Sequence, residues 1–278
     1  MPTLLTPATI RASLEAHGLR PSRALGQHFL ADPNTARRIV RLADIHPGDP
    51  VIEVGPGLGS LTLALLDAGA SVTAIELDRH VIDALRANLG EAAATVVHGD
   101  ALDADWDVLA PRPGTAMVAN LPYNVATHVV VRALETSRNL GRFLVMVQRE
   151  VGERLAATAG SKTYGAVSVK VAFHGRAEVV GFVPASVFIP APRVESALVA
   201  ITRHARPPVE VDDPAAMFAL VRAGFATRRK MLRQSLRAVL GVESTVILER
   251  AGIAPTARAE ELELSAWAAL ATVAGHPR

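Results

Sequence analysis

The first two hundred residues alternate between short apolar runs and amphipathic stretches. The apolar runs are typical of buried parallel strands and lie at residues 51–54, 71–75, 94–98, 115–119 and 142–147. Helical periodicity separates them, at residues 33–43, 60–68 and 127–134, with a further helix ending near residue 158. Extended, β-rich runs follow at 167–173 and 178–183, and residues 196–202 close the sheet as a seventh strand. The pattern predicts an α/β domain.

Capping residues mark two helix starts near the N-terminus. Thr6 precedes Pro7 at the start of a helix that we expect to end near His17, and Asp32 precedes Pro33 in the same way. The stretch between them, residues 20–30, is basic, contains a glycine and has no clear period. We interpret it as a loop, of which residues 26–30 lie across the front of whatever the sheet binds.

The composition changes at residues 204–214, where prolines and acids gather, and this break predicts a domain boundary. We expect one domain at residues 1–205 and a small all-α domain at residues 206–278. Its predicted helices lie at 214–240, 243–251 and 258–274. Ahead of the boundary, residues 159–165 form a glycine-flanked loop that could close over a polyanion or simply connect two elements.

Residues 214–242 carry six basic residues and no Asp or Glu, although the net charge of the whole chain is only +2. The densest part contains Arg228, Arg229, Lys230 and Arg233. A solvated basic face is one interpretation. The absence of acids in this stretch favours contact with the phosphates of a nucleic acid.

Four predicted strands end in a glycine or a polar residue. The first leads into Gly55-Pro56-Gly57-Leu58-Gly59, and the next three end at Glu76, Asp100 and Asn120. Parallel strands place their carboxyl ends at one edge of a sheet, so we expect these residues to face one crevice. Glu76 can accept both hydroxyls of an adenosine ribose, and Asp100 can accept from an adenine amino group; a helix-capping role for Asp100 is the alternative.

The tetrapeptide Asn120-Leu121-Pro122-Tyr123 follows the fourth strand. It offers an amide oxygen, a carbonyl beyond the end of the sheet, a stiff proline and an aromatic face. Two acceptors beside a stacking ring suit a flat substrate with an exocyclic amino group, such as adenine. A plain strand-ending turn with a packed tyrosine is the alternative.

Several classes of protein are disfavoured. The chain has 278 residues, no cysteine and no apolar run long enough to span a membrane, so we expect no disulfide, no thiolate zinc site and no membrane segment. The first fifteen residues do not have the pattern of a secretory signal, and we expect a cytoplasmic protein. The histidines lack metal-site spacing, no Gly-x-Ser-x-Gly is present, and the Gly-x-Gly-x-Gly spacing disfavours an NAD-dependent oxidoreductase.

Taken together, the motifs resemble the KsgA/RsmA family of ribosomal RNA adenine dimethyltransferases, which are related to the Erm resistance methylases. The matching segments are Gly26-Gln-His-Phe-Leu30, Glu53-Val-Gly-Pro-Gly-Leu-Gly59, Glu76-Leu-Asp78, Gly99-Asp-Ala101, Asn120-Leu-Pro-Tyr123, Phe188-Ile-Pro-Ala-Pro-Arg-Val-Glu-Ser196 and Phe225-Ala-Thr-Arg-Arg-Lys-Met-Leu-Arg233. They cover nearly the whole chain from residue 20 onward. One departure is His28, where many members carry Asn.

The resemblance implies a class I, Rossmann-like methyltransferase sheet of seven mostly parallel strands, the seventh antiparallel. It implies S-adenosylmethionine as cofactor and no metal. The implied donor-binding residues are His28, Leu30, Gly55, Gly57, Glu76, Asp100, Ala101 and Asn120. The implied catalytic residues are Asn120, Leu121, Pro122, Tyr123 and Phe188, with Tyr123 and Phe188 holding the base between them.

The resulting hypothesis is an enzyme that dimethylates N6 of adenosines in 16S ribosomal RNA during small-subunit biogenesis, acting as a monomer. Arg228, Arg229, Lys230 and Arg233 are the expected RNA contacts. An Erm-type enzyme for 23S ribosomal RNA and a non-catalytic ribosome assembly factor are the alternatives. The segment from Phe225 to Arg233 favours the small-subunit target.

Overall fold

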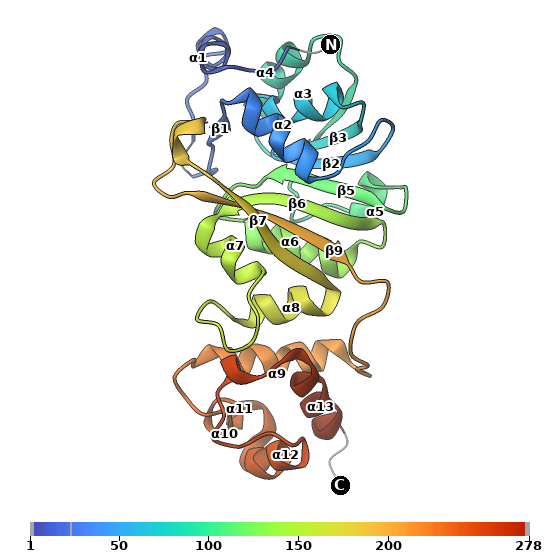
Figure 1. The fold of residues 1–278 in the computed structure, drawn as a ribbon, viewed down its shortest axis with the longest axis vertical. Helices are drawn as coiled ribbons and strands as arrows, with labels where there is room; N and C mark the ends of the chain where they lie inside the picture. Colours follow the sequence, from blue (N-terminus) through green and yellow to red (C-terminus); the bar gives the residue numbers. More distant parts are fainter. Residues whose placement is uncertain (1–2, 23, 276–278) are drawn as a thin grey trace. The chain divides into compact units, whose positions relative to one another are not determined.

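The computed structural model describes residues 3–22 and 24–275. It contains a seven-stranded sheet with the strand order β4-β3-β2-β5-β6-β9-β7 (Figure 1). Its strands are β2 (Pro50–Val54), β3 (Ser71–Glu76), β4 (Ala94–His98), β5 (Thr115–Asn120), β6 (Leu140–Gln148), β7 (Gly175–Val183) and β9 (Ser196–Arg203). The first five strands in this order, β4, β3, β2, β5 and β6, run parallel to one another, whereas β9 is antiparallel to β6. The predicted fold class is confirmed.

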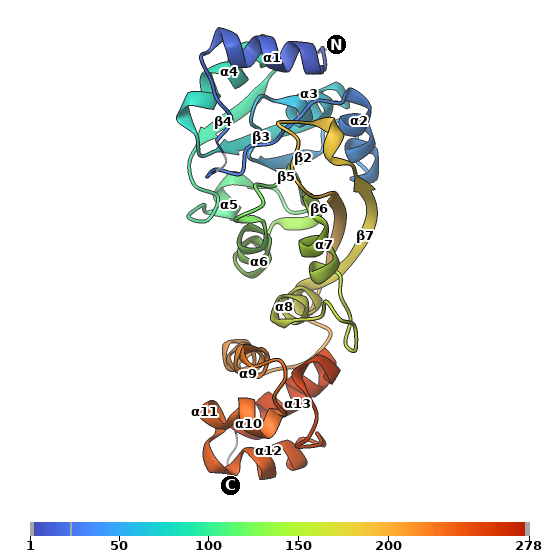
Figure 2. The ribbon, with the colours of Figure 1, turned by 90° about the vertical axis from the view of Figure 1, so that its left-hand side faces the viewer.

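Helices cover both faces of this sheet, with α2 and α3 on one side and α5 and α6 on the other (Figure 2). The helices up to β7 are α1 (Pro7–Ala16), α2 (Pro33–Leu42), α3 (Ser60–Asp67), α4 (Arg79–Leu89), α5 (Trp106–Leu109), α6 (Ala126–Thr136), α7 (Arg149–Leu155) and α8 (Ala166–His174). The predicted caps are confirmed, because Thr6 accepts a hydrogen bond from the Thr9 amide and Asp32 accepts one from the Thr35 amide. Each cap satisfies an amide that the first helical turn leaves without a partner.

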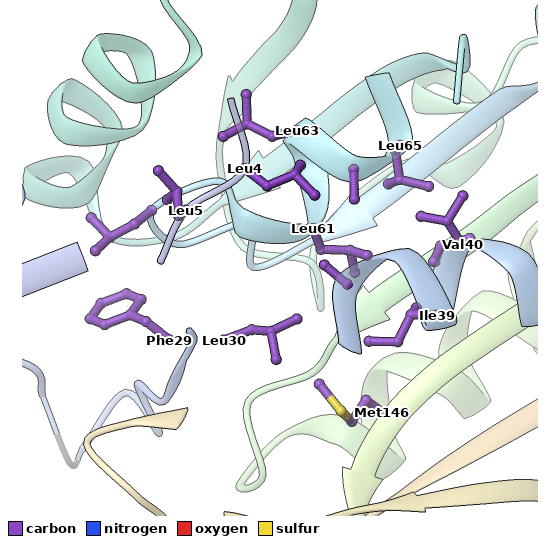
Figure 3. Packing of buried hydrophobic residues seen from close by; sticks show 14 of the residues in the cluster. Leu4, Leu5, Phe29, Leu30, Ile39, Val40, Leu61, Leu63, Leu65 and Met146 are labelled. Atoms are coloured by element: carbon purple, nitrogen blue, oxygen red, sulfur yellow. The ribbon is translucent and has the colours of Figure 1, made fainter. Parts of the chain in front are cut away.

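The layer formed by α2 and α3 fixes the position of the turn that leads into α3. Ile39 and Val40 of α2 lie beside Leu61 and Leu65 of α3, and all four are buried (Figure 3). Burying a side chain of this size contributes about 1.5–3 kcal/mol each. The start of α3 is therefore held firmly against the sheet.

The sequence predicted a loop at residues 26–30, but part of this segment forms a strand. Phe29 and Leu30 form β1 (Phe29–Leu30), which pairs antiparallel with β8 (Phe188–Ile189) in a separate two-stranded sheet. The short 3-10 helix η1 (Ala185–Val187) leads into β8. Both β1 residues are buried, so the N-terminal segment is anchored beside the ends of the main strands.

The chain divides into two compact units. The first contains the residues up to Gly152 together with Ala177–Arg203, and the second contains Glu153–Arg176 together with the chain from His204 onward. The predicted boundary near residue 205 coincides with the return of the chain to the second unit. This division differs from the expected single domain at residues 1–205, because Glu153–Arg176 groups with the chain from His204 onward.

The prediction of a β-rich run at residues 167–173 was wrong, because these residues form α8. Ser168 explains the helix start: its hydroxyl accepts from the Gly165 amide and donates to the Arg154 carbonyl. Val169 and Phe173, four residues apart, are buried in the core of the second unit. Packing on one helical face therefore overrides the strand propensity of the valines.

The predicted helix at 214–240 was also wrong, because it is broken into three. The remaining helices of the second unit are α9 (Pro214–Ala226), α10 (Leu232–Ser235), α11 (Arg237–Leu240), α12 (Ser244–Arg250) and α13 (Leu264–Gly275), with 3-10 turns η2 (Gly241–Glu243) and η3 (Ala259–Glu261). Thr227 leaves the helical region, and the Leu232 amide donates to the Ala257 carbonyl instead of continuing α9. The break buries Leu232 completely, and this burial compensates for the lost helical hydrogen bonds.

The described residues contain no helix that is both long enough and apolar enough to cross a bilayer.

Candidate functional site

A cavity opens at the carboxyl ends of β2, β3 and β5. It lies beside residues 25–30, which we call the N-terminal segment. Three of the four strand ends singled out in the sequence contribute to it, through Gly55, Glu76 and Asn120. His28 and Leu30 line it from the N-terminal side. The parallel order of the strands is what brings these distant residues to one edge.

The glycine turn after β2 forms one wall of the cavity. Gly57 has a φ of +56°, and a Cβ placed there would lie 2.9 Å from the Phe29 ring. Any side chain at this position would therefore both strain the backbone and push against β1. The turn keeps its main chain exposed to a ligand, as phosphate- and nucleotide-binding turns do.

Glu76 links this turn to the end of β3. Its Oε2 accepts from the Gly57 amide and its Oε1 accepts from the Asp78 amide, both at 3.0 Å. Burial raises the pKa of Glu76, and the two backbone hydrogen bonds counteract that rise. Each carboxylate oxygen keeps a further lone pair for a ligand hydroxyl.

A second carboxyl, that of Glu53, lies inside β2 and also lines the cavity. It is 1% exposed. Burial raises the pKa of Glu53 to about 8; the Thr62 hydroxyl lowers it and the Glu76 carboxylate raises it further. Two carboxyl groups therefore border the cavity. Glu76 accepts from two backbone amides, whereas Glu53 is influenced by the Thr62 hydroxyl and the Glu76 carboxylate.

Asn120 and Leu121 present acceptors at the end of β5. The Asn120 Nδ2 donates to the His28 carbonyl at 3.1 Å, which orients the amide and leaves Oδ1 as its second polar atom. The Leu121 amide donates to Met146, and the described residues provide no hydrogen bond to the Leu121 carbonyl. Two acceptors are thus available at one turn.

Tyr123 supplies the aromatic face at this turn. Its hydroxyl is 2.7 Å from the Ser196 hydroxyl, and burial raises its pKa while that hydrogen bond lowers it. The His28 ring stacks on it, with centroids 5.5 Å apart and an interplanar angle of 26°. The Pro190 carbonyl accepts from His28 Nδ1 at 2.7 Å, so the imidazole is held in place on the tyrosine ring.

Three expected site residues do not line this cavity. Asp100 accepts from the Leu102 amide at 2.8 Å in a turn, and Ala101 is buried beside it. The helix-capping alternative is also wrong, because the next helix begins at Trp106 and its cap is Asp105. Phe188 is 3% exposed within the hydrophobic core of the first unit. The expected sandwich of Tyr123 and Phe188 is therefore not formed, because β8 pairing with β1 turns Phe188 into the core.

The sequence of this chain matches the family model described as ribosomal RNA adenine dimethylase over residues 19–274. The chain belongs to this family. Three similar relatives are each named ribosomal RNA small subunit methyltransferase A. They come from Leifsonia xyli (48% identical, covering 96% of this chain and 98% of the relative), Cutibacterium acnes (47%, 94% and 91%) and Streptomyces coelicolor (45%, 96% and 96%).

Two solved structures are similar to this member of the family. The 23S rRNA methyltransferase ErmE is 27% identical with a TM-score of 0.66, covering 89% of this chain and all of that one. A dimethyladenosine transferase from Plasmodium falciparum is 24% identical with a TM-score of 0.74, covering 87% and 96%. The latter likeness concerns the fold.

Several residues of the site were given no role by the sequence analysis. Gln27, which was quoted in a family motif, donates to Asp78 at 2.8 Å, and Asn124, which was not, donates to the Ala24 carbonyl at 3.2 Å. Both hydrogen bonds hold the segment around residues 24–27 against the strand ends. Ser196 holds Tyr123. Glu53 had a visible signal in the sequence, because a lone carboxyl inside a fully apolar strand must be buried.

The second unit contains the basic segment, which we define as residues 228–233. Arg228 pairs with Glu260 at 2.9 Å and donates to the Lys162 carbonyl. The absence of acids within residues 214–242 therefore does not leave Arg228 unpaired, because Glu260 lies outside that stretch. Arg229, Lys230 and Arg233 are exposed, and no hydrogen bond or ion pair of their side chains is found within the described residues.

The loop at residues 159–165 is a packed connection in this structure. Tyr164 is 3% exposed and donates to the Leu262 carbonyl at 3.0 Å, and the Gly160 amide donates to the Glu260 carbonyl. Burial raises the pKa of Tyr164 to about 12, and the Glu263 carboxylate adds to this effect. No group of three or more potential metal-ligating side chains occurs among the residues that the structure describes.

Proposed function

We propose that this chain transfers methyl groups from S-adenosylmethionine to N6 of adenosines in 16S ribosomal RNA, giving N6,N6-dimethyladenosine during small-subunit biogenesis. Membership of the adenine dimethylase family and 45–48% identity to small-subunit methyltransferases support the reaction and the target. The observation that carries the proposal is the turn after β5. There an oriented amide, an unbonded carbonyl and an aromatic ring border one cavity.

Two features of the cavity fit S-adenosylmethionine. Both Gly55 and Gly57 have a positive φ, and the Phe29 ring leaves no room for a side chain at Gly57, so the turn suits close contact of its backbone with an extended ligand. Glu76 keeps an acceptor on each oxygen for the two hydroxyls of a ribose. When bound, S-adenosylmethionine supplies a methyl group on a cationic sulfur atom.

Asn120 and Leu121 activate the substrate amino group. Adenine N6 is a weak nucleophile because its lone pair is delocalised into the ring. The Asn120 Oδ1 and the Leu121 carbonyl accept its two hydrogens and turn the lone pair out of the ring plane. No strong general base is required, since the proton becomes acidic once N6 carries the new methyl group, and positioning supplies the rest of the rate enhancement.

Tyr123 holds the base by stacking, which is worth about 1–3 kcal/mol per base. His28 already lies on the same ring and is held there by the Pro190 carbonyl. The base leaves its RNA context to enter the cavity, at a cost of a few kcal/mol when it is stacked. Stacking on Tyr123 offsets much of that cost.

The exposed residues of the basic segment contact the RNA backbone in this proposal. Arg229, Lys230 and Arg233 have no protein partner within the described residues, so their charges are available to phosphates. Arg228 divides its guanidinium between Glu260 and a backbone carbonyl. Its first role is therefore to hold the second unit together.

The test is to incubate the protein with labelled S-adenosylmethionine and, separately, immature small and large ribosomal subunits. The account predicts labelled N6,N6-dimethyladenosine in the small-subunit RNA. Label confined to the large-subunit RNA would support an Erm-type activity and contradict the proposed target. Tight binding to the small subunit without any label would instead support a non-catalytic assembly factor.

A further inference from the structure

An exposed aromatic ring lies on the first unit, outside the cavity. Phe182, near the end of β7, is 42% exposed, whereas the next residue, Val183, is fully buried. The central carbon of the Arg149 guanidinium lies 4.7 Å from the centroid of the Phe182 ring. Neither residue lines the cavity. A cation therefore packs on the ring, while much of the ring surface stays open to solvent.

Arg149 lies at the same edge of the sheet as the turn after β5. It directly follows β6, the strand beside β5, and its amide donates to the Glu195 carbonyl at 3.0 Å. The residue after Glu195 is Ser196, whose hydroxyl is 2.7 Å from that of Tyr123. Only a short span of backbone therefore separates Phe182 and Arg149 from the ring on which the target base is proposed to stack.

Arg38 of α2 fixes the backbone beside the exposed ring. Its Nη1 donates to the Phe182 carbonyl at 3.0 Å. Gly181 leaves room for this contact, because a Cβ at that position would overlap the Arg38 guanidinium. The strand β7 is at the edge of the sheet, so this side of it is covered by α2 rather than by another strand. Charges on α2 therefore lie beside Phe182.

Further arginines continue along α2. Arg37 and Arg41 are exposed and four residues apart, and Arg41 is three residues from Arg38, so the three side chains are neighbours on the helix. The helix contains no Asp or Glu, and Asp44 beyond its end lies 3.7 Å from the His46 ring. No hydrogen bond or ion pair of the Arg37 and Arg41 side chains is found within the described residues. Their charges are therefore available to an anion.

An aromatic ring beside a row of cations matches the chemistry of a single-stranded nucleic acid. Unpaired bases stack on aromatic rings and on guanidinium planes, and arginines bind the phosphates that join the bases. The Glu195 carboxylate already pairs with Arg149, with Nη1 and Oε2 3.0 Å apart. Arg149 and Phe182 therefore offer a flat surface for a base, whereas the charges free for phosphates are those of Arg37 and Arg41.

We propose that Phe182 and Arg149 form a stacking platform for an unpaired nucleotide close to the target adenosine, and that Arg37 and Arg41 bind phosphates of the same strand. The inference rests on the proposed function, since this strand is the one that delivers the adenosine to the cavity. The first unit then holds the RNA next to the reacting base, independently of the basic segment on the second unit.

The experiment measures equilibrium binding of immature small ribosomal subunits to the full chain, without methyl donor, over a series of salt concentrations. Phe182→Ala should weaken binding about tenfold, whereas Phe182→Trp should bind at least as tightly as the wild type. Phe182→Leu keeps an apolar side chain without a flat ring and should be as weak as Phe182→Ala. Arg37→Ala and Arg41→Ala should each lower the slope of the salt dependence by about one unit.

Val108→Ala and Arg86→Ala are the matched controls. Val108 is 72% exposed on α5, and Arg86 is exposed on α4, so the pair reproduces the loss of an exposed apolar side chain and of an exposed charge on other elements. Both should bind with the affinity and the salt slope of the wild type. Losses equal to those of the Phe182 and α2 variants would overturn the proposal.

Two further outcomes would also decide against it. Wild-type affinity in Phe182→Ala would remove the platform and leave the proposed function standing. Wild-type affinity in Phe182→Leu alongside weak binding by Phe182→Ala would indicate an apolar contact with a protein of the subunit instead of a stacked base. If the wild type failed to bind small subunits at all, the proposed target itself would be contradicted.

Discussion

The cavity at the strand ends and the basic segment present their polar groups in different ways. In the cavity, Glu76 and Asn120 are oriented by hydrogen bonds to backbone atoms before any ligand arrives. In the basic segment, Arg229 and Lys230 are exposed and extend from a turn. The first arrangement suits chemistry that depends on position, whereas the second suits attraction of a polyanion of variable geometry.

The comparison predicts that changes in the cavity alter stability or donor binding, whereas changes in the exposed basic residues alter RNA binding alone. The largest expected effect concerns Glu53 and the stability of the unliganded protein. Its pKa is raised from 4.5 to about 8, so the folded state binds more protons than the unfolded state across that window. Stability is therefore lost as the pH rises from about 4.5 to 8.

Glu53→Gln removes this loss because glutamine does not titrate. The stability of the variant relative to the wild type should therefore increase by a few kcal/mol, on the order expected for a strongly raised pKa, between pH 5 and pH 8. Urea unfolding at pH 5 and pH 8 without ligand measures the difference. A gap between the two proteins that stays constant with pH would show that Glu53 is not protonated in the folded state.

The next largest effect is expected at the glycine turn. Gly57→Val places a side chain at a φ of +56° and against the Phe29 ring, so donor affinity should fall about tenfold to a hundredfold. Equilibrium binding of S-adenosylmethionine measures this. Gly90→Ala is the control, because Gly90 has a φ of +57° with no atom within 4 Å of the added Cβ and lies outside the cavity. If the Gly57 variant bound S-adenosylmethionine as tightly as the control, the glycine turn would not be part of the donor site.

A smaller effect is expected in the basic segment, where replacing Arg228 should lower stability and replacing Arg229 or Lys230 should not. Arg228→Ala loses a partly exposed ion pair with Glu260, worth up to about 1 kcal/mol, and should lower the melting temperature by a few degrees. Arg229→Ala and Lys230→Ala should leave melting unchanged. Each should reduce the salt dependence of RNA binding by about one unit of slope. Equal loss of stability in all three variants would show that the whole segment is structural.

The smallest effect is expected from the Tyr123 hydroxyl. Tyr123→Phe keeps the ring and loses only the hydrogen bond to Ser196, worth about 0.5–1.5 kcal/mol. Turnover should fall by no more than about tenfold. Tyr123→Ala also loses the stacking surface and should be clearly worse. Equal defects in the two variants would mean that the hydroxyl, rather than the ring, serves the reaction.

The sequence was most informative where topology leaves little choice. Apolar runs located the strands, and the rule that parallel strands end at one edge brought Gly55, Glu76 and Asn120 together. The same rule failed for Asp100, because a local hydrogen bond to the Leu102 amide competes for its carboxylate. Phe188 was expected at the base only from the family resemblance, and its direction depends on β1–β8 pairing between segments about 160 residues apart.

Helix ends were less predictable in the second unit. The pattern from residue 214 to 240 predicts one helix, since no proline interrupts it after Pro214. The break arises from a tertiary contact, in which the Leu232 amide donates to the Ala257 carbonyl and Leu232 becomes buried. The valines of α8 led to the wrong prediction of a strand for the same reason. The residues that they pack against, such as Phe218 and Trp267, lie far along the chain.

Asn120 offers the most direct test of the account. Asn120→Ala removes one of the two acceptors proposed for adenine N6 and leaves the Glu76 carboxylate and the glycine turn in place. Dimethyladenosine formation on immature small subunits should fall at least about a hundredfold, while donor affinity changes by less than about tenfold. Near-normal methylation by Asn120→Ala would contradict the proposed role of the turn after β5.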